Sequence, residues 1–196
     1  MNPSERLQQI KQKALQEAIP IISDEGLEIL SFLISKHQVH RVLEIGTAVG
    51  YCAIALSIAH PVEVTTIERN ESMFQQAKAH IALCMMESKI TLIQGDAQVL
   101  ELLDPLPFDL LFIDAAKAQY QKFFEKFSPL VKVGGIVVCD NLSFHGFADG
   151  TQVALSRDLK QLVRKINRFK TWLSTEDAWE TSFLSLGDGM SISFKK

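Results

Sequence analysis

The chain has 196 residues, 47% of them hydrophobic and 22% charged, and its formal net charge is −3. This composition predicts one soluble globular domain over residues 1–196 and excludes a protein that is basic overall, so nucleic-acid binding would need a local basic patch. No apolar run approaches the ~18 residues of a membrane span. Three widely spaced cysteines, Cys52, Cys84 and Cys139, suit a reducing compartment, and we expect a cytoplasmic protein.

Two helices are predicted in the first part of the chain. The first covers about Ser4–Ala18, and the second begins after a cap at Ser23 or Asp24. Between them, Ile19 precedes a proline, which favours an extended backbone. The apolar positions of the first helix are Leu7, Ile10, Ala14 and Leu15.

From residue 42 onward, apolar strands alternate with helices. The predicted strands are Val42–Ile45, Val62–Ile67, Ile90–Gln94, Leu110–Ile113 and Gly135–Cys139. The predicted helices are Tyr51–Ala59, Asn70–Glu87, Ala97–Leu102, Ala118–Leu130 and Arg157–Leu173. A Gly-Asp-Gly turn between Thr181–Leu186 and Met190–Phe194 predicts an antiparallel hairpin. The expected fold is α/β and Rossmann-like: a doubly wound, mostly parallel seven-stranded sheet with helices on both faces and this hairpin at its end.

A glycine-containing loop follows the first predicted strand. The apolar run ends at Gly46, Gly50 comes four residues later, and a helical pattern begins directly after it. Glycines let a backbone approach a ligand closely, and a helix N-terminus offers unpaired N–H groups. The spacing differs from the Gly-x-Gly-x-x-Gly of dinucleotide sites, and Glu44 would repel a pyrophosphate. We therefore expect an adenosine-like ligand without a phosphate at this loop.

Acidic residues occur at the carboxyl ends of the predicted strands, where open α/β sheets bind ligands. Glu68 ends the second strand, and its carboxylate is suited to accept hydrogen bonds from both ribose hydroxyls. Asp96, after the third strand, is suited either to an adenine amino group or to a helix N-cap. A single acid at a strand end is usually a cap, but several at one edge beside a glycine loop indicate a binding site.

A second group of polar residues follows the last two parallel strands. Asp114, Asp140 and Asn141 supply two carboxylates and an amide oxygen, which are the hard ligands that Mg²⁺ prefers. Lys117 lies about one helical turn after Asp114 and is either a general base for this site or a solvated surface lysine.

Four segments resemble the metal-dependent O-methyltransferases of the catechol and caffeoyl-CoA type. They are Leu43–Tyr51, Ile67–Asn70, Phe112–Tyr120 and Val137–Leu142. The resemblance implies an S-adenosylmethionine cofactor, Mg²⁺ or another divalent cation, a homodimer and a helical lid or cap over residues 1–36. It implies cofactor contacts from Glu44, Gly46, Thr47, Gly50, Tyr51, Cys52, Glu68, Asp96, Ala97 and Asp114. It implies metal binding by Asp114, Asp140 and Asn141, with Lys117 as the catalytic base.

Two residues depart from the family pattern. Cys52 stands where a serine is common, which weakens one expected cofactor contact. In catechol enzymes an acid near the start of the terminal hairpin helps hold the substrate, but Ser182 occupies the corresponding place and Glu180 is the nearest acid. These residues therefore do not favour catechol itself as the substrate.

The predicted helix over residues 157–173 raises the question of an RNA substrate. Arg157, Lys160, Arg164 and Arg168 form a basic stripe, and no acid follows Asp158 in the helix. Such a stripe is either a solvated face or a contact to RNA phosphates. Beyond Asn141, the aromatic side chain of Phe144 either packs the loop or stacks on an extruded base. Ile21 and Tyr120 are further candidate substrate contacts.

The C-terminal half carries a second resemblance, to the bacterial tRNA 5-hydroxyuridine methyltransferases. The matching segments are Asn141–Gly146, Asn167–Leu173 and Thr181–Ser193. This resemblance implies methylation of wobble 5-hydroxyuridine to 5-methoxyuridine, in which the 5-hydroxyl and the 4-carbonyl chelate one metal as a catechol does. The alternatives are methylation of a small catechol-like or caffeoyl-type phenol and a cofactor-binding module without catalysis.

Overall fold

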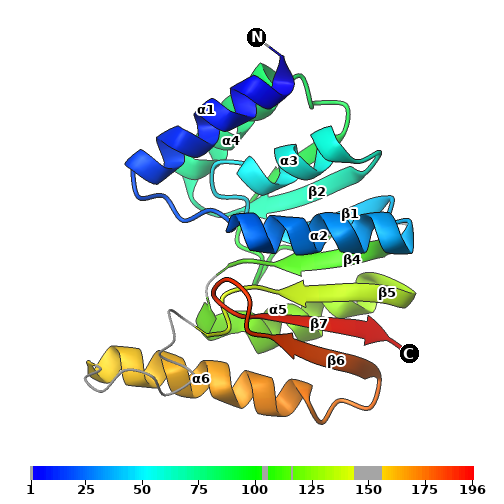
Figure 1. Ribbon diagram of the computed structural model, residues 1–196. Coiled ribbons are helices and arrows are strands. Elements are labelled where there is room, and N and C mark those ends of the chain that lie inside the picture. The colour runs from blue at the N-terminus through cyan, green and yellow to red at the C-terminus, as the bar shows by residue number, and fades with distance from the viewer. Residues whose placement is uncertain (1, 103–105, 116, 144–155) are drawn as a thin grey trace.

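A seven-stranded sheet forms the centre of the computed structural model, which describes residues 2–102, 106–115, 117–143 and 156–196 (Figure 1). The strands are β1 (Arg41–Ile45), β2 (Glu63–Glu68), β3 (Ile90–Gln94), β4 (Phe108–Ile113), β5 (Val131–Cys139), β6 (Trp179–Leu184) and β7 (Met190–Lys195). Their order is β3-β2-β1-β4-β5-β7-β6. The first five strands are parallel, and β7 is antiparallel to both β5 and β6. The predicted mostly parallel sheet with a terminal hairpin is confirmed.

Helices pack on both faces of the sheet. They are α1 (Pro3–Gln16), α2 (Asp24–His37), α3 (Tyr51–Ala59), α4 (Glu71–Leu83), α5 (Tyr120–Phe127) and α6 (Arg157–Leu173). Successive strand side chains point to opposite faces. Accordingly Val42 and Leu110 pack in one apolar cluster with residues of α1 to α4, while Leu43 and Leu111 pack in another with residues of α5 and α6. None of the described helices is long and apolar enough to cross a membrane.

The strand register brings the predicted acids to one edge of the sheet. Ile45 pairs with Ile67 of β2 on one side and with Ile113 of β4 on the other, and Ile113 pairs in turn with Cys139 of β5. The residues that follow these four positions are therefore neighbours at the carboxyl edge. This edge carries the candidate site described below.

The helix predicted over Ala97–Leu102 is wrong, because the chain there makes only a turn. The backbone N–H groups of Val99 and Leu100 both donate to the carbonyl of Asp96, at 3.0 and 2.8 Å. The side chain of Val99 is 78% exposed, whereas Leu100 and Leu102 are partly buried against the core without a regular helix. The connection from β3 to β4 consequently has no regular helix in its described part.

Several predicted boundaries are also corrected. α4 ends at Leu83, before the predicted Glu87, because Met85 adopts a left-handed conformation with φ of 58°. The predicted helix over 118–130 is divided into the 3₁₀ turn η1 (Lys117–Gln119), α5 and a second 3₁₀ turn, η2 (Ser128–Leu130). In α1, Leu15 is 61% exposed and does not join the buried stripe.

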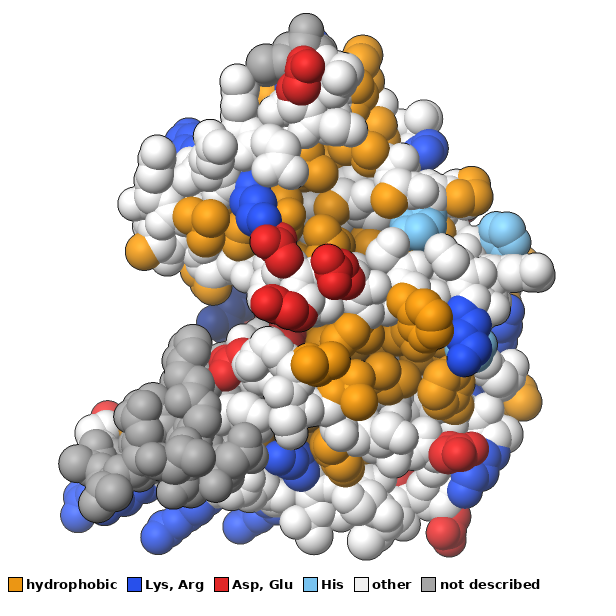
Figure 2. Space-filling model, viewed as in Figure 1, with side chains coloured by type: hydrophobic (Ala, Val, Ile, Leu, Met, Phe, Trp, Pro, Cys, Tyr) orange, Lys and Arg blue, Asp and Glu red, His pale blue; other side chains and the backbone are white. Residues whose placement is uncertain are grey.

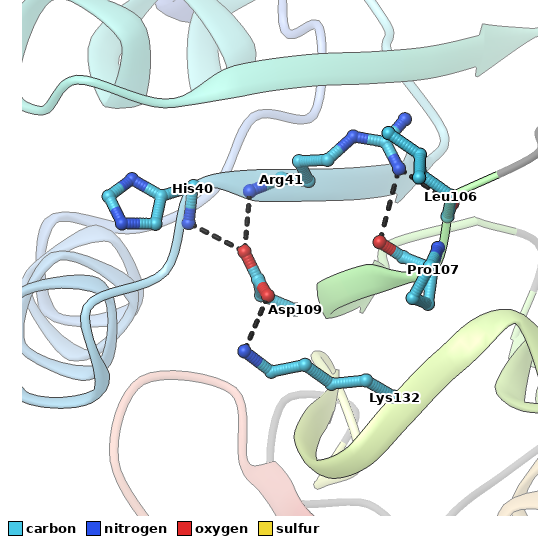
Figure 3. Close-up of polar contacts among 6 residues, drawn as sticks. All are labelled: His40, Arg41, Leu106, Pro107, Asp109 and Lys132. Carbon is cyan, nitrogen blue, oxygen red and sulfur yellow. Dashed lines mark hydrogen bonds and ion pairs between the residues drawn. The ribbon is translucent and has the colours of Figure 1, made fainter.

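A polar cluster joins three strands near their amino-terminal ends, opposite the candidate site (Figure 3). The carboxylate of Asp109 accepts hydrogen bonds from the backbone N–H groups of His40 at 2.7 Å and Arg41 at 2.8 Å, and it pairs with Lys132 at 2.6 Å. The guanidinium of Arg41 donates to the carbonyl of Leu106 at 2.6 Å. Burial opposes ionisation of Asp109, but these partners outweigh it and lower the pKa of the carboxyl. The cluster fixes β1, β4 and β5 relative to one another, away from the candidate site.

Candidate active site

A cavity of about 470 Å³ opens at the carboxyl ends of the parallel strands. Its volume falls within the range of small-molecule and cofactor pockets. It lies where the sequence predicts a ligand, and most of the predicted cofactor residues line it. The lining residues predicted from the sequence are Ile21, Gly46, Thr47, Tyr51, Cys52, Glu68, Asp96, Ala97, Asp114 and Asn141.

The loop between β1 and α3 owes its path to two glycines. Gly46 has a φ of +102°, and a Cβ atom there would lie 2.2 Å from the backbone oxygen of Asp114. Only glycine therefore lets the loop pass this close to the end of β4. Gly50, with φ of +85°, is the N-cap of α3 and lies outside the cavity lining. Its role in the structure is to turn the chain into the helix.

The carboxylate of Glu68 is fixed in the cavity wall by backbone hydrogen bonds. One oxygen accepts from the N–H of Ala48 at 2.9 Å, and the other accepts from the N–H of Asn70 at 2.8 Å. The side chain is 9% exposed. Each carboxylate oxygen can accept more than one hydrogen bond, so both oxygens retain capacity for the hydroxyl groups of a ligand.

Asp96 also lines the cavity, at the end of β3. Its carboxylate accepts from the backbone N–H of Gln98 at 2.8 Å, which is the local bond of a cap or turn. The adjacent Ala97 is buried in the wall. The turn thus exposes one polar side chain to the cavity, and the sequence expectation of an adenine contact at Asp96 is compatible with this position.

Glu44 lies beneath the cavity and does not line it. The side chain is 2% exposed, and one oxygen accepts a hydrogen bond from the hydroxyl of Thr66. Burial raises the pKa of this carboxyl to about 7, and the nearby charges of Asp114 and Glu68 add to the effect. Burial likewise raises the pKa of the neighbouring Cys52 thiol well above its usual value. The floor of the site therefore holds a carboxyl that is ionised only in part near neutral pH.

The structure brings together the three residues predicted to bind a metal. The side-chain amide of Asn141 donates to Asp114 at 2.8 Å, and the backbone N–H of Asn141 donates to the carboxylate of Asp140 at 2.7 Å. Asp140 is 5% exposed. No cluster of three His, Cys, Asp or Glu side chains suited to a metal occurs among the described residues. The set here has only two carboxylates, and its third member is an amide.

This donor set fits a hard divalent cation. Two carboxylates and an amide oxygen are ligands of the type that Mg²⁺ and Ca²⁺ take, and their small number leaves positions for water or substrate oxygens. Lys117 begins the 3₁₀ turn η1 shortly after Asp114, but its side chain lies outside the described part of the structure.

The candidate substrate residues are distributed differently. Ile21 lines the cavity, whereas Tyr120 is 1% exposed and its hydroxyl donates to the backbone carbonyl of Asp140 at 2.7 Å. Tyr120 therefore supports the loop that follows β5 and does not line the cavity. Phe144 lies outside the described residues. Arg164 and Arg168 are exposed on α6, away from the cavity lining.

Sequence reasoning missed several lining residues. Pro20 and Ile22 come from the segment between α1 and α2, Arg69 follows Glu68, and Phe123 belongs to α5. The position of Arg69 beside a predicted ligand residue was an available signal. Phe123 had none, because in the sequence it is one apolar residue of an amphipathic helix.

The basic stripe of α6 is present on the surface. One side of α6 is buried through Ile166, Phe169 and Leu173, and the four stripe residues are exposed on the other side. Figure 2 shows Lys and Arg side chains gathered along α6, at the bottom of the view. The helix carries six basic side chains and one acid, in a chain whose formal net charge is −3. It is thus a local basic surface on an acidic protein.

Comparison with known proteins gives consistent matches. A family model described as O-methyltransferase matches residues 2–196. A caffeoyl-CoA O-methyltransferase of Populus kitakamiensis is 32% identical over 183 residues, covering 89% of this chain and 77% of the relative. A flavonoid 3',5'-methyltransferase of Vitis vinifera is 28% identical, covering 86% and 75%.

Solved structures show the same fold. A Staphylococcus aureus protein provisionally assigned as a caffeoyl-CoA O-methyltransferase has a TM-score of 0.92 and 37% identity, covering 97% of this chain and 92% of the other. A Bacillus cereus O-methyltransferase in complex with SAH has a TM-score of 0.82 and 24% identity, covering 98% and 91%, and at this identity it supports the fold alone.

Proposed function

This chain belongs to the O-methyltransferase family and is an S-adenosylmethionine-dependent O-methyltransferase of the caffeoyl-CoA type, and we propose that it uses a divalent cation to methylate 5-hydroxyuridine at the tRNA wobble position. The product would be 5-methoxyuridine. The observation that carries the RNA acceptor is the exposed basic stripe of α6 on an otherwise acidic protein.

The cavity residues suit the methyl donor. S-adenosylmethionine supplies an electrophilic methyl group on a positively charged sulfur. Among the described residues, Glu68, Asp96 and Asp114 line the cavity against one lining cation, Arg69, so acids predominate in its walls, which suits a sulfonium better than a pyrophosphate. In this proposal the carboxylate of Glu68, held by its two backbone donors, accepts hydrogen bonds from the ribose hydroxyls. The loop from Gly46 to Tyr51 encloses the methionine end.

The second half of the proposed site holds the acceptor. Asp114, Asp140 and Asn141 would hold Mg²⁺ or a similar cation, whose chemistry is to lower the pKa of a hydroxyl group and orient it. Lys117 is the proposed base that removes the proton of the acceptor hydroxyl. Ile21 lines the cavity and would offer an apolar contact to the acceptor ring.

RNA phosphates would contact the surface of α6. Arginine and lysine bind phosphates by charge and hydrogen bonding without reading sequence, so the stripe would position the RNA while the cavity selects the base. Arg164 and Arg168 are central in the exposed stripe. The acceptor fits the chemistry of the site because 5-hydroxyuridine presents two adjacent oxygens, the 5-hydroxyl and the 4-carbonyl.

The test is methyl transfer from labelled S-adenosylmethionine to two acceptors, tRNA that carries 5-hydroxyuridine and simple catechols. We expect label in the tRNA, and label that enters the catechols alone would refute the RNA acceptor. The double substitution Arg164→Glu with Arg168→Glu should reduce tRNA methylation and spare any catechol turnover. Lys13→Glu with Lys36→Glu makes the same change of net charge on α1 and α2 and should leave tRNA methylation unchanged.

A small phenol is the second candidate acceptor, and the relatives favour it. The matched Populus kitakamiensis and Vitis vinifera proteins are named for caffeoyl-CoA and flavonoid substrates. Such a substrate would make no use of the α6 stripe, so the charge-reversal variants separate the two acceptors. A cofactor-binding module without catalysis would transfer no label, and Lys117→Ala would leave its cofactor affinity unchanged.

A further inference from the structure

The tip of the β6–β7 hairpin is hydrogen-bonded to the loop that follows β5. The backbone N–H of Leu142 donates to the carbonyl of Gly189 at 2.8 Å, and the N–H of Ser143 donates to the carbonyl of Asp188 at 2.7 Å. From α5, the hydroxyl of Tyr120 donates to the carbonyl of Asp140 at 2.7 Å. The three bonds hold the backbone on both sides of the residue between them.

That residue, Asn141, has a positive φ of 61°. Residues other than glycine rarely adopt this backbone conformation, and it persists where the surrounding structure fixes it. The bonds to Asp140, Leu142 and Ser143 bracket Asn141 in this way. The outcome is that the side-chain amide of Asn141 lies beside Asp114, with its nitrogen donating to a carboxylate oxygen at 2.8 Å.

The contact between the hairpin tip and the loop depends on a glycine. Gly189 has a φ of +81°, and a Cβ atom there would lie 2.2 Å from the hydroxyl oxygen and 2.7 Å from the backbone nitrogen of Ser143. A hydroxyl can rotate away, but a backbone nitrogen moves only with its loop. Any side chain at position 189 must therefore displace either the tip or residues 140–143.

We propose that Gly189 and Tyr120 are positioning residues, which hold Asp140 and Asn141 in the arrangement that binds the divalent cation. The inference rests on the metal site of the proposed function. It adds that the affinity for the cation is set by the terminal hairpin and by α5, neither of which supplies a ligand. Groups that orient metal ligands commonly affect metal affinity even though they do not touch the metal.

The chain offers a matched control for the glycine. Gly134, in β5, also has a positive φ, of +75°, but nothing lies within 4 Å of a Cβ atom built there. Gly134→Ala and Gly189→Ala therefore impose similar backbone strain, and only the second creates a clash with the metal loop. Tyr120→Phe removes one hydroxyl and one hydrogen bond, and it leaves the buried ring in place.

The experiment measures Mn²⁺ binding by titration calorimetry, SAH binding by the same method, and the midpoint of thermal unfolding. Gly189→Ala and Tyr120→Phe should weaken Mn²⁺ binding by about tenfold or more, the usual effect of losing a group that supports a metal ligand. SAH affinity should stay at the wild-type value in both variants and in Gly134→Ala. Methyl transfer by the two test variants should recover as the Mn²⁺ concentration is raised.

The outcomes separate this inference from the proposed function. Wild-type protein that binds SAH but no Mn²⁺ would overturn the metal site and with it the positioning role. Wild-type Mn²⁺ affinity in both test variants would overturn the positioning role alone. If Gly134→Ala and Gly189→Ala weakened Mn²⁺ binding equally, the positioning role would also be overturned, since backbone strain anywhere in the fold would then account for the lost affinity. If Gly189→Ala does not fold, Tyr120→Phe decides.

Discussion

Replacing the buried acid beneath the cavity, by Glu44→Gln, should change how stability depends on pH. The carboxyl of Glu44 is 2% exposed, and its pKa is raised from 4.5 to about 7, chiefly by burial. A shift of one pKa unit corresponds to about 1.4 kcal/mol, so the ionised form destabilises the folded state by about 3 kcal/mol. Glutamine cannot ionise, yet it keeps an oxygen that can accept from the hydroxyl of Thr66.

The direction in which stability changes with pH follows from proton linkage at Glu44. Its folded pKa lies above its unfolded value, so the folded state holds the proton more tightly. Below about pH 4.5 the group is protonated in both states and has no effect. As the pH rises from about 4.5 through 7, the wild type loses free energy of unfolding because the buried carboxyl must ionise in the folded state, while Glu44→Gln loses none. The variant should therefore gain about 2–3 kcal/mol relative to the wild type between pH 5 and pH 8, since part of the effect is already present at pH 5.

The assay is urea unfolding of both proteins at pH 5 and pH 8 without cofactor. Glu63→Gln, at an exposed position of β2, is the control and should show the same small difference at both pH values. If the free-energy difference between Glu44→Gln and the wild type were equal at pH 5 and pH 8, the carboxyl would not titrate in this range. The argument from burial would then be wrong.

Three further changes test the packing of the fold. Asp109→Asn should lower the free energy of unfolding by about 2 kcal/mol at pH 7 in urea titrations, because the charged partner of Lys132 is lost. This difference should shrink at acidic pH, since a carboxyl with a lowered pKa stabilises only above that pKa; a constant difference would refute the ion-pair account. Phe124→Ala should lower the free energy of unfolding by about 3–5 kcal/mol. It should also alter the fluorescence of Trp172 and Trp179, whose ring centroids lie 5.5 and 5.0 Å from that of Phe124. An unchanged spectrum would contradict this packing. Phe32→Ser, at a side chain 60% exposed, should change stability by less than about 0.5 kcal/mol, and a larger loss would mean that this surface is covered in solution.

The strands could be predicted because buried parallel strands have a continuous apolar signal. Every residue from Leu110 to Ile113 is buried, as the sequence run indicates. The helix over 97–102 could not be decided in this way, because six residues with four apolar positions fit a turn as well as a helix. The carbonyl of Asp96 accepts both backbone N–H groups of the turn, and the chain does not continue into a second helical turn.

The candidate site could be predicted as a set of residues at strand ends. The contacts that hold the loop after β5 could not be predicted. Glu68, Asp114 and Asn141 follow apolar runs, and the parallel register brings them to one edge. The contact between Gly189 and the loop at Ser143 joins residues far apart in the chain, and nothing local in the sequence indicates it. Tyr120 shows the same limit, since it was a candidate substrate contact, whereas its hydroxyl is bonded to the backbone carbonyl of Asp140.

The position of β7 has a consequence for the order in which the fold can be completed during synthesis. β7 lies between β5 and β6, so the last strand of this chain is an interior strand of the sheet. Until residues 190–195 have been translated, β5 has an unpaired edge and β6 has no neighbour. The five parallel strands can pair with one another while the ribosome is still at work, because all of them precede the hairpin in the sequence. The region that the hairpin tip supports is therefore assembled after the parallel strands, and a chain that stalls before Met190 presents the open edge of β5 to other nascent chains.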